Sequence, residues 1–350
     1  SMKRICFFIC IVMLFTTVAV RGESEIVPAE DARAYILIEQ STGDVLLEQN
    51  ADEQLPIASV TKIMTMLLIM EEIDSGRLSY DDIVTVSENA MSYGGSTMFL
   101  ETGEQLPVSD MLKGIAVASA NDGCVAMAEH ICGSETAFVE KMNEKAKELG
   151  MTNTHFVNTN GLDDENHYSS ARDVAIMSRE LLNHPGILNY TSIWTDELRD
   201  GKFKLANTNK LIRFYTGANG LKTGSTSAAL CCLSASAVRD DMQLIAVVLG
   251  APTSAKRFSS AKALLDYGFA NYGITKLAES GEEICDADVI NGTVQTVKGI
   301  CKEDKTMLDK KGGAQSIERR VFIDEDLSAP LHEGDVIGRL EFVRGDTVVD

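Results

Sequence analysis

The sequence predicts an α+β protein: a β-sheet with helices packed on it, followed by a small all-β domain. Three observations lead to this prediction. Apolar runs of helical length recur between residues 59 and 267. Short β-prone runs precede the first of these helices and separate the last two. Beyond about residue 275, Gly, Asp and Lys interrupt short β-prone runs, and no long helix is predicted.

Four apolar runs of strand length form two pairs, and each pair is joined by a short polar turn. They are Ala34–Glu39 with Val45–Glu48, and Leu230–Val238 with Met242–Leu249. The first turn includes STGD at 41–44, and the second is RDD at 239–241. Turn residues between two β-prone runs predict antiparallel hairpins.

The helix candidates share apolar residues on a helical period. They are Ser59–Met70, Met111–Val117, Gly123–Ile131, Ala171–Leu182 and Ser259–Tyr267. The polar residues SAND at 119–122 separate the second candidate from the third. The apolar fraction of the chain, 45%, is sufficient for a buried core.

The N-terminus has the pattern of a secretory signal. Lys3 and Arg4 precede sixteen mostly apolar residues, 5–20, and small residues follow near Ala19 and Gly22. An uncleaved membrane anchor is the alternative, but a bilayer needs roughly 20 apolar residues. We therefore expect a signal peptide at 1–22, a larger domain at 23–274 and a β-rich domain at 275–350.

The chain is strongly acidic, with a formal net charge of −20. Removal of residues 1–22 leaves 29 basic and 52 acidic residues, a formal charge of −23. Such a surface repels the phosphate backbone, so a nucleic-acid partner is not expected.

Cysteines and histidines indicate no metal site. The chain has no CxxC, and its five histidines show no HxxxH or HExxH spacing. Cys124 and Cys132 lie about 12 Å apart along one predicted helix, beyond disulfide reach. Cys285 and Cys301 are the remaining candidates for a bridge, and the sequence leaves that pairing open.

A Ser-x-x-Lys motif opens the first long helix. Ser59 and Lys62 are three positions apart, so on a helix the hydroxyl and the amine share a face. A serine is a weak nucleophile until a base takes its proton, and lysine serves if burial or a nearby cation lowers its pKa. The spacing recurs at Ser259 and Lys262, where an exposed helix face is the simpler interpretation.

Two further motifs follow. Ser119-Ala120-Asn121 lies at the break between two apolar helices, where a loop can direct a hydroxyl and an amide into a cleft. Lys222-Thr223-Gly224 occurs once, before a strand. There the glycine lets a substrate approach an edge strand, while the lysine and threonine offer donors to an anion.

The order of the three motifs is more specific than any one of them. Ser-x-x-Lys, then Ser-x-Asn sixty residues further on, then Lys-Thr-Gly about a hundred beyond that, is the pattern of serine penicillin-recognising enzymes. The surrounding sequence resembles the low-molecular-weight D-alanyl-D-alanine carboxypeptidases, the S11 peptidases. The matching stretches are 56–65, 95–100, 161–163, 168–173, 207–211, 220–224, 247–250, 329–331 and 334–338.

This resemblance implies a β-lactamase/transpeptidase-like catalytic domain, an antiparallel sheet with helices on both faces, with a small all-β C-terminal domain. It implies that Ser59 attacks the carbonyl between two terminal D-alanines and that Lys62 accepts its proton. Ser119 is expected to relay that proton, and Asn121 to bind the substrate or steady Lys62.

The resemblance also implies a site for the substrate carboxylate and for the oxyanion. Lys222, Thr223 and Arg257 are expected to hold the carboxylate, and Gly224 completes the triplet. The backbone N–H groups of Ser59 and Ser225 are expected to form the oxyanion hole. The expected partners are a peptidoglycan stem peptide and β-lactam antibiotics, with no metal or organic cofactor.

Two other functions share parts of this pattern. A β-lactamase needs a Glu-x-x-Leu-Asn segment, whereas residues 161–166 read GLDDEN. A penicillin sensor without turnover would require additional membrane spans and a cytoplasmic domain. We expect an exported protein acting at the outer face of the membrane or in the wall, with peripheral association through a C-terminal segment beyond this sequence.

Overall fold

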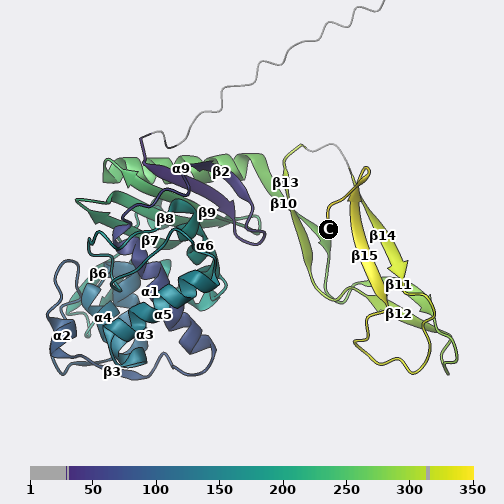
Figure 1. Cartoon of the computed structure of the whole chain (residues 1–350), viewed down its shortest axis with the longest axis horizontal. Helices are drawn as coiled ribbons and strands as arrows, with labels where there is room; N and C mark the ends of the chain where they lie inside the picture. Colours follow the sequence, from purple (N-terminus) through teal and green to yellow (C-terminus); the bar gives the residue numbers. More distant parts are fainter. Residues whose placement is uncertain (1–28, 30, 313–315) are drawn as a thin grey trace, which may run out of the picture.

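The computed structural model describes residues 29, 31–312 and 316–350. Its main sheet is antiparallel, in the order β2-β1-β9-β8-β7 (Figure 1). The strands are β1 Ala34–Glu39, β2 Val45–Gln49, β7 Ala218–Thr226, β8 Leu230–Arg239 and β9 Met242–Ala251. Both predicted hairpins are confirmed, and the edge strand β7 was not predicted. The signal predicted at 1–22 lies outside the described residues.

Helices cover both faces of this sheet (Figure 1). Side chains alternate along β1, so Ile36 and Ile38 join the core shared with α1 and α6, while Leu37 packs with α9. This confirms the predicted fold class. The principal helices are α1 Lys62–Asp74, α3 Val108–Ala118, α4 Asn121–Cys132, α5 Glu135–Glu148, α6 Ala171–Leu182 and α9 Ser254–Asn271.

The helix predicted at Ser59–Met70 begins differently. Residues Ala58–Thr61 form a 3-10 turn, η1, and α1 starts only at Lys62. The β-branched residues Val60 and Thr61 have low helix propensity, and Ala58 has a positive φ of 50° that an α-helix excludes. Ser59 therefore lies on a tight turn at the helix entrance.

Short elements complete the larger body. They are β3 Ile83–Thr85, α2 Glu88–Met91, β4 Gln105–Pro107, η2 Pro185–Ile187, α7 Leu188–Thr191, β5 Thr195–Leu198, β6 Phe203–Ala206 and α8 Leu211–Phe214. The strands β3 and β4 pair with each other, as do β5 and β6. Among the described residues, no helix has the length and apolar character needed to cross a membrane.

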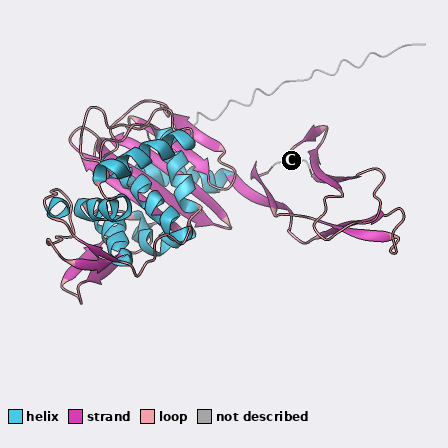
Figure 2. Cartoon of the chain, turned by 60° about the horizontal axis from the view of Figure 1, so that its bottom comes forward, coloured by secondary structure: helices cyan, strands magenta, loops and turns pink. Residues whose placement is uncertain are grey.

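The described residues after Asn271 form strands and turns, as predicted (Figure 2). They are β10 Tyr272–Ala278, β11 Glu283–Asp288, β12 Thr296–Ile300, β13 Lys305–Lys310, β14 Ile317–Ile323, β15 Gly338–Arg344 and β16 Thr347–Val348. The domain boundary predicted at 274/275 stays a prediction, since β10 runs through it. Cys285 and Cys301 are both free, and the Cys301 thiol donates to the Glu303 carbonyl.

Candidate active site

Ser59 and Lys62 meet at the start of α1. Lys62 Nζ lies 2.7 Å from Ser59 Oγ, 3.1 Å from Ser119 Oγ and 2.9 Å from the Asn160 carbonyl oxygen. An ammonium group has three N–H donors, and these three acceptors match them. Deprotonation leaves a lone pair on the same nitrogen, within reach of the Ser59 hydroxyl proton.

Burial prepares Lys62 for proton transfer. Its side chain is fully buried, and this desolvation lowers its pKa to about 8, although Cys124 and Asp122 act in the opposite direction. The neutral amine is therefore accessible close to neutral pH. Of the two causes that the sequence suggested, burial and a nearby cation, burial is the one that lowers the pKa of Lys62 most.

Ser119 and Asn121 lie at the junction of α3 and α4, as the sequence predicts. Ser119 ends α3 in the left-handed conformation, with φ 60° and ψ 41°, which separates the two helices. The Asn121 amide nitrogen donates to the Gly94 carbonyl at 2.9 Å. Its Oδ1 is buried and has no hydrogen-bond partner among the residues that the structure describes.

The Lys222-Thr223-Gly224 triplet precedes the strand β8, as predicted, and itself lies within the edge strand β7, which was not predicted. A Cβ added to Gly224 would lie 2.7 Å from the Ser59 nitrogen and 2.9 Å from the Ile57 carbonyl oxygen. Glycine is thus required because β7 approaches η1 of the same chain this closely. The sequence had attributed it to the approach of a substrate.

Lys222 adds a second buried amine to the site. Burial, together with the positive charge of Lys62, holds the pKa of Lys222 well below its usual range. Its Nζ donates to the Thr223 carbonyl at 2.9 Å, and Thr223 Oγ1 lies 2.6 Å from Thr208 Oγ1. The motifs from three distant stretches of the chain therefore converge.

Arg257 is buried and donates a hydrogen bond to Gly224, the last residue of the Lys222-Thr223-Gly224 triplet. On α9, its guanidinium donates to the Gly224 carbonyl at 3.1 Å and to Ser254 Oγ at 2.9 Å. Its positive charge is close enough to Lys222 to lower the pKa of that lysine further. Ser225 follows Gly224 on β7, opposite Cys231 of β8.

One segment of the site, residues 157–168, was not recognised from the sequence as functional. It supplies the Asn160 carbonyl to Lys62, and its Thr159 carbonyl accepts from Thr65 Oγ1 at 2.6 Å. Gly161 has φ 95°, and a Cβ there would come within 1.8 Å of the Ala58 carbonyl oxygen. A backbone carbonyl as partner leaves no signature in residue type, so only the family-like stretches 161–163 and 168–173 pointed to this region.

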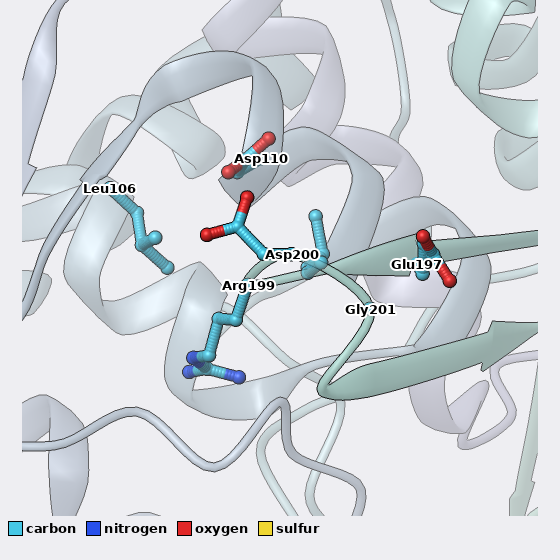
Figure 3. A pocket seen from close by; sticks show the side chains of 7 residues that line it. Leu106, Asp110, Glu197, Arg199, Asp200 and Gly201 are labelled. Carbon is cyan, nitrogen blue, oxygen red and sulfur yellow. The ribbon is translucent and has the colours of Figure 1, made fainter.

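A separate cavity of about 420 Å³ opens between β4, α3 and the β5–β6 turn (Figure 3). Asp110, Glu197 and Asp200 line it together with Arg199. Three carboxylates repel an anionic substrate end, so this cavity does not suit the terminal carboxylate. The described residues contain no cluster of His, Cys, Asp or Glu able to hold a metal ion.

A serine hydroxyl paired with a buried lysine, beside a second serine and a cationic edge strand, defines a serine acyl-transfer enzyme. Comparison with known proteins agrees. The family model for D-alanyl-D-alanine carboxypeptidase, Peptidase_S11, matches residues 21–253. The model for the C-terminal domain of penicillin-binding protein 5 matches residues 272–350. The chain therefore belongs to peptidase family S11, the serine-type D-alanyl-D-alanine carboxypeptidases, as its sequence predicts.

Individual relatives match most of the chain. D-alanyl-D-alanine carboxypeptidase DacF of Bacillus subtilis is 46% identical over 316 residues, 89% of this chain and 81% of its own. DacC of Escherichia coli is 35% identical, over 94% of this chain and 84% of its own.

Solved structures show the same fold. Penicillin-binding protein 5 from Haemophilus influenzae has a TM-score of 0.78 at 35% identity, covering 91% of this chain and 94% of its own. Penicillin-binding protein D2 from Listeria monocytogenes, in its ampicillin-bound form, has a TM-score of 0.62 at 34% identity, covering 68% and 98%.

Proposed function

We propose that this carboxypeptidase removes the terminal D-alanine from peptidoglycan stem pentapeptides through an acyl-enzyme on Ser59. The observation that supports it most directly is the 2.7 Å contact between Ser59 Oγ and Nζ of the fully buried Lys62. This pair provides a nucleophile together with its base.

In the acylation step, neutral Lys62 accepts the Ser59 proton while Oγ attacks the carbonyl carbon between the two D-alanines. The backbone N–H groups of Ser59 and Ser225 donate to the developing oxyanion. Collapse of the tetrahedral intermediate breaks the C–N bond. Lys62 passes the proton through Ser119, 3.1 Å away, to the departing amine.

Hydrolysis of the ester then reverses these roles. Water attacks the acyl carbon, loses a proton to the Lys62–Ser119 pair, and Ser59 recovers its own proton when the C–O bond breaks. In residues 161–166, where a β-lactamase would have a Glu-x-x-Leu-Asn segment, the chain has GLDDEN. Beside that stretch, Asn160 directs a carbonyl, not a carboxylate, at Lys62. This arrangement favours peptide hydrolysis over rapid β-lactam turnover.

Recognition of the substrate carboxylate follows from a local reversal of charge. The chain has a net charge of −20, yet the amine of Lys222 and the guanidinium of Arg257 are buried at β7. Thr223 adds a hydroxyl beside them. A bound carboxylate favours the charged form of the amine. Asn121 Oδ1, which lacks a partner within the described residues, accepts an amide N–H of the stem peptide.

Mass spectrometry after treatment with penicillin tests the acyl-enzyme. One adduct is expected, on the peptide that contains Ser59, and none in Ser59→Ala or Lys62→Ala. Normal labelling of Lys62→Ala would refute the role of the lysine. The exposed pair Ser259 and Lys262 offers a matched control, since Lys262→Ala should label like the wild type.

Substrate turnover separates the proposed reaction from its rivals. Release of D-alanine from a D-Ala-D-Ala peptide should exceed hydrolysis of penicillin by a wide margin. The reverse order would identify a β-lactamase, and labelling without either turnover would identify a penicillin sensor. We further propose that the enzyme acts outside the cytoplasmic membrane, where its stem-peptide substrate lies, with residues 23–274 as its catalytic domain and 275–350 as its β-rich domain.

A further inference from the structure

Three hydrogen bonds connect η1 and α1 to residues 157–168, which we call the clamp segment. The segment contacts α1 through two backbone carbonyls, those of Asn160 and Thr159, which accept from Lys62 and Thr65. A third contact involves side chains alone: Thr61 Oγ1 lies 2.7 Å from His167 Nε2. Thr61 is the last residue of η1 and directly precedes Lys62, the proposed base, so this contact restrains the backbone next to Lys62.

The tautomer of His167 follows from its other neighbour. The Val157 backbone N–H donates to His167 Nδ1 at 3.0 Å, so Nδ1 carries the lone pair and the ring proton lies on Nε2. Nε2–H therefore donates to Thr61 Oγ1. Burial lowers the pKa of His167 to about 4, and Phe156 packs edge-on against the ring at 5.6 Å. The imidazole is thus neutral and fixed across the working pH range.

We propose that His167 is a positioning residue for acylation: through Thr61 it holds the Ser59–Lys62 turn against the clamp segment, so that the Asn160 carbonyl stays on Lys62. This inference rests on the proposed function. Without the His167 contact, η1 and the clamp segment can separate and water can reach the Lys62 amine. Hydration favours the ammonium form and raises the pKa of the lysine toward its ordinary value.

The readout is the pH at which acylation reaches half its maximal rate, measured with a fluorescent penicillin. Desolvation of Lys62 sets this midpoint, near 8 in the wild type. The ionisable groups that act on Lys62 or interact with it across the site are Cys124 and Asp122 of α4 and Lys222 of β7. None of them is altered by the variants below. A residue that only supports overall stability would leave the midpoint in place.

Two carboxamide variants of His167 distinguish the contribution of Nδ1 from that of Nε2. In His167→Asn the amide oxygen takes the place of Nδ1 and still accepts from Val157, but no donor reaches Thr61. In His167→Gln the amide nitrogen takes the place of Nε2 and donates to Thr61. His167→Asn should acylate about tenfold more slowly at pH 7 and shift the midpoint upward by about one unit, and His167→Gln should recover most of this loss.

Thr61→Val provides a second route to the same test, because it removes the acceptor and leaves the imidazole and its bond to Val157 in place. It should slow acylation and shift the midpoint as His167→Asn does. It decides the question alone if His167→Asn fails to fold by circular dichroism. His130→Asn, at an exposed histidine of α4, is the matched control and should behave like the wild type.

Wild-type rates and an unshifted midpoint in both His167→Asn and Thr61→Val would overturn the positioning role. Equal losses in His167→Gln and His167→Asn would also overturn it, because the donor to Thr61 would then be irrelevant. A wild-type protein that penicillin does not label on Ser59 would instead refute the proposed function.

Discussion

Gly224 of β7 lies directly against Ser59 of η1: a Cβ built on the glycine would come within 2.7 Å of the serine nitrogen and 2.9 Å of the Val60 nitrogen. No rotamer change relieves such a contact, since both atoms belong to the backbone. Gly224→Ala should therefore push the edge strand away from the turn that carries Ser59, the proposed nucleophile. Acylation by penicillin should fall by about a hundredfold or more, because misplacement of about 1 Å costs that much.

Gly273→Ala is the control for that substitution. In β10 the nearest atom to a new Cβ is Lys311 Cε at 4.0 Å, the end of a flexible side chain. Its acylation rate should equal that of the wild type. A normal rate in Gly224→Ala, measured by stopped-flow with a fluorescent penicillin, would mean that the proximity of β7 to η1 has no catalytic importance.

Acylation should depend on pH through Lys62. In the proposed mechanism the neutral amine is the active form, so the rate should rise with pH and level off above a midpoint near 8. Lys62→Arg keeps the positive charge but does not deprotonate in this range, and it should be inactive at every pH. The measurement is the second-order acylation rate between pH 5 and 10. A flat profile in the wild type would exclude Lys62 as the base.

Thr65 tests the clamp segment through stability. Its Oγ1 donates to the Thr159 carbonyl at 2.6 Å, and both residues are fully buried. Thr65→Val keeps the shape and leaves the carbonyl without this donor, which should lower the free energy of unfolding by about 1–3 kcal/mol. Thr65→Ser retains a hydroxyl and should lose less. Urea denaturation of the two variants measures the difference, and equal losses would show that packing, not the hydrogen bond, accounts for them.

The parts of the fold that were predictable depend on neighbours in the chain. Ala171–Leu182 forms a helix with the predicted bounds because Ser170 caps it, accepting from the Asp173 N–H, and its apolar period is regular. The helix α5 was not predicted. Its buried residues, Phe138, Met142 and Ala146, are spaced by four along an otherwise charged stretch. That sparse apolar spacing is the sequence signal for this helix.

The candidate site likewise has parts that the sequence predicts and parts that it does not. The roles proposed for Ser59, Lys62, Ser119 and Lys222 depend on side chains whose types form ordered motifs, so the sequence was able to bring them together. The clamp segment contributes backbone carbonyls. Its histidine contact joins residues 106 positions apart, a separation that a single sequence does not encode in any local pattern. The strand position of the triplet likewise depends on which strands pair in the sheet.

The expected role of Arg257 in binding the substrate carboxylate can be tested by comparing two peptide substrates. Its planar guanidinium donates at once to the Gly224 carbonyl and to Ser254 Oγ, a geometry that an ammonium group does not reproduce. Arg257→Lys should therefore lose about tenfold in kcat/KM on a peptide that ends in a free D-Ala-D-Ala carboxylate. On the same peptide with an amidated C-terminus the loss should be smaller, because the carboxylate is gone. Lys256→Gln, which removes an exposed positive charge one residue away, should alter neither rate. Equal losses of Arg257→Lys on both peptides would show that the guanidinium supports β7 without contributing to recognition of the carboxylate.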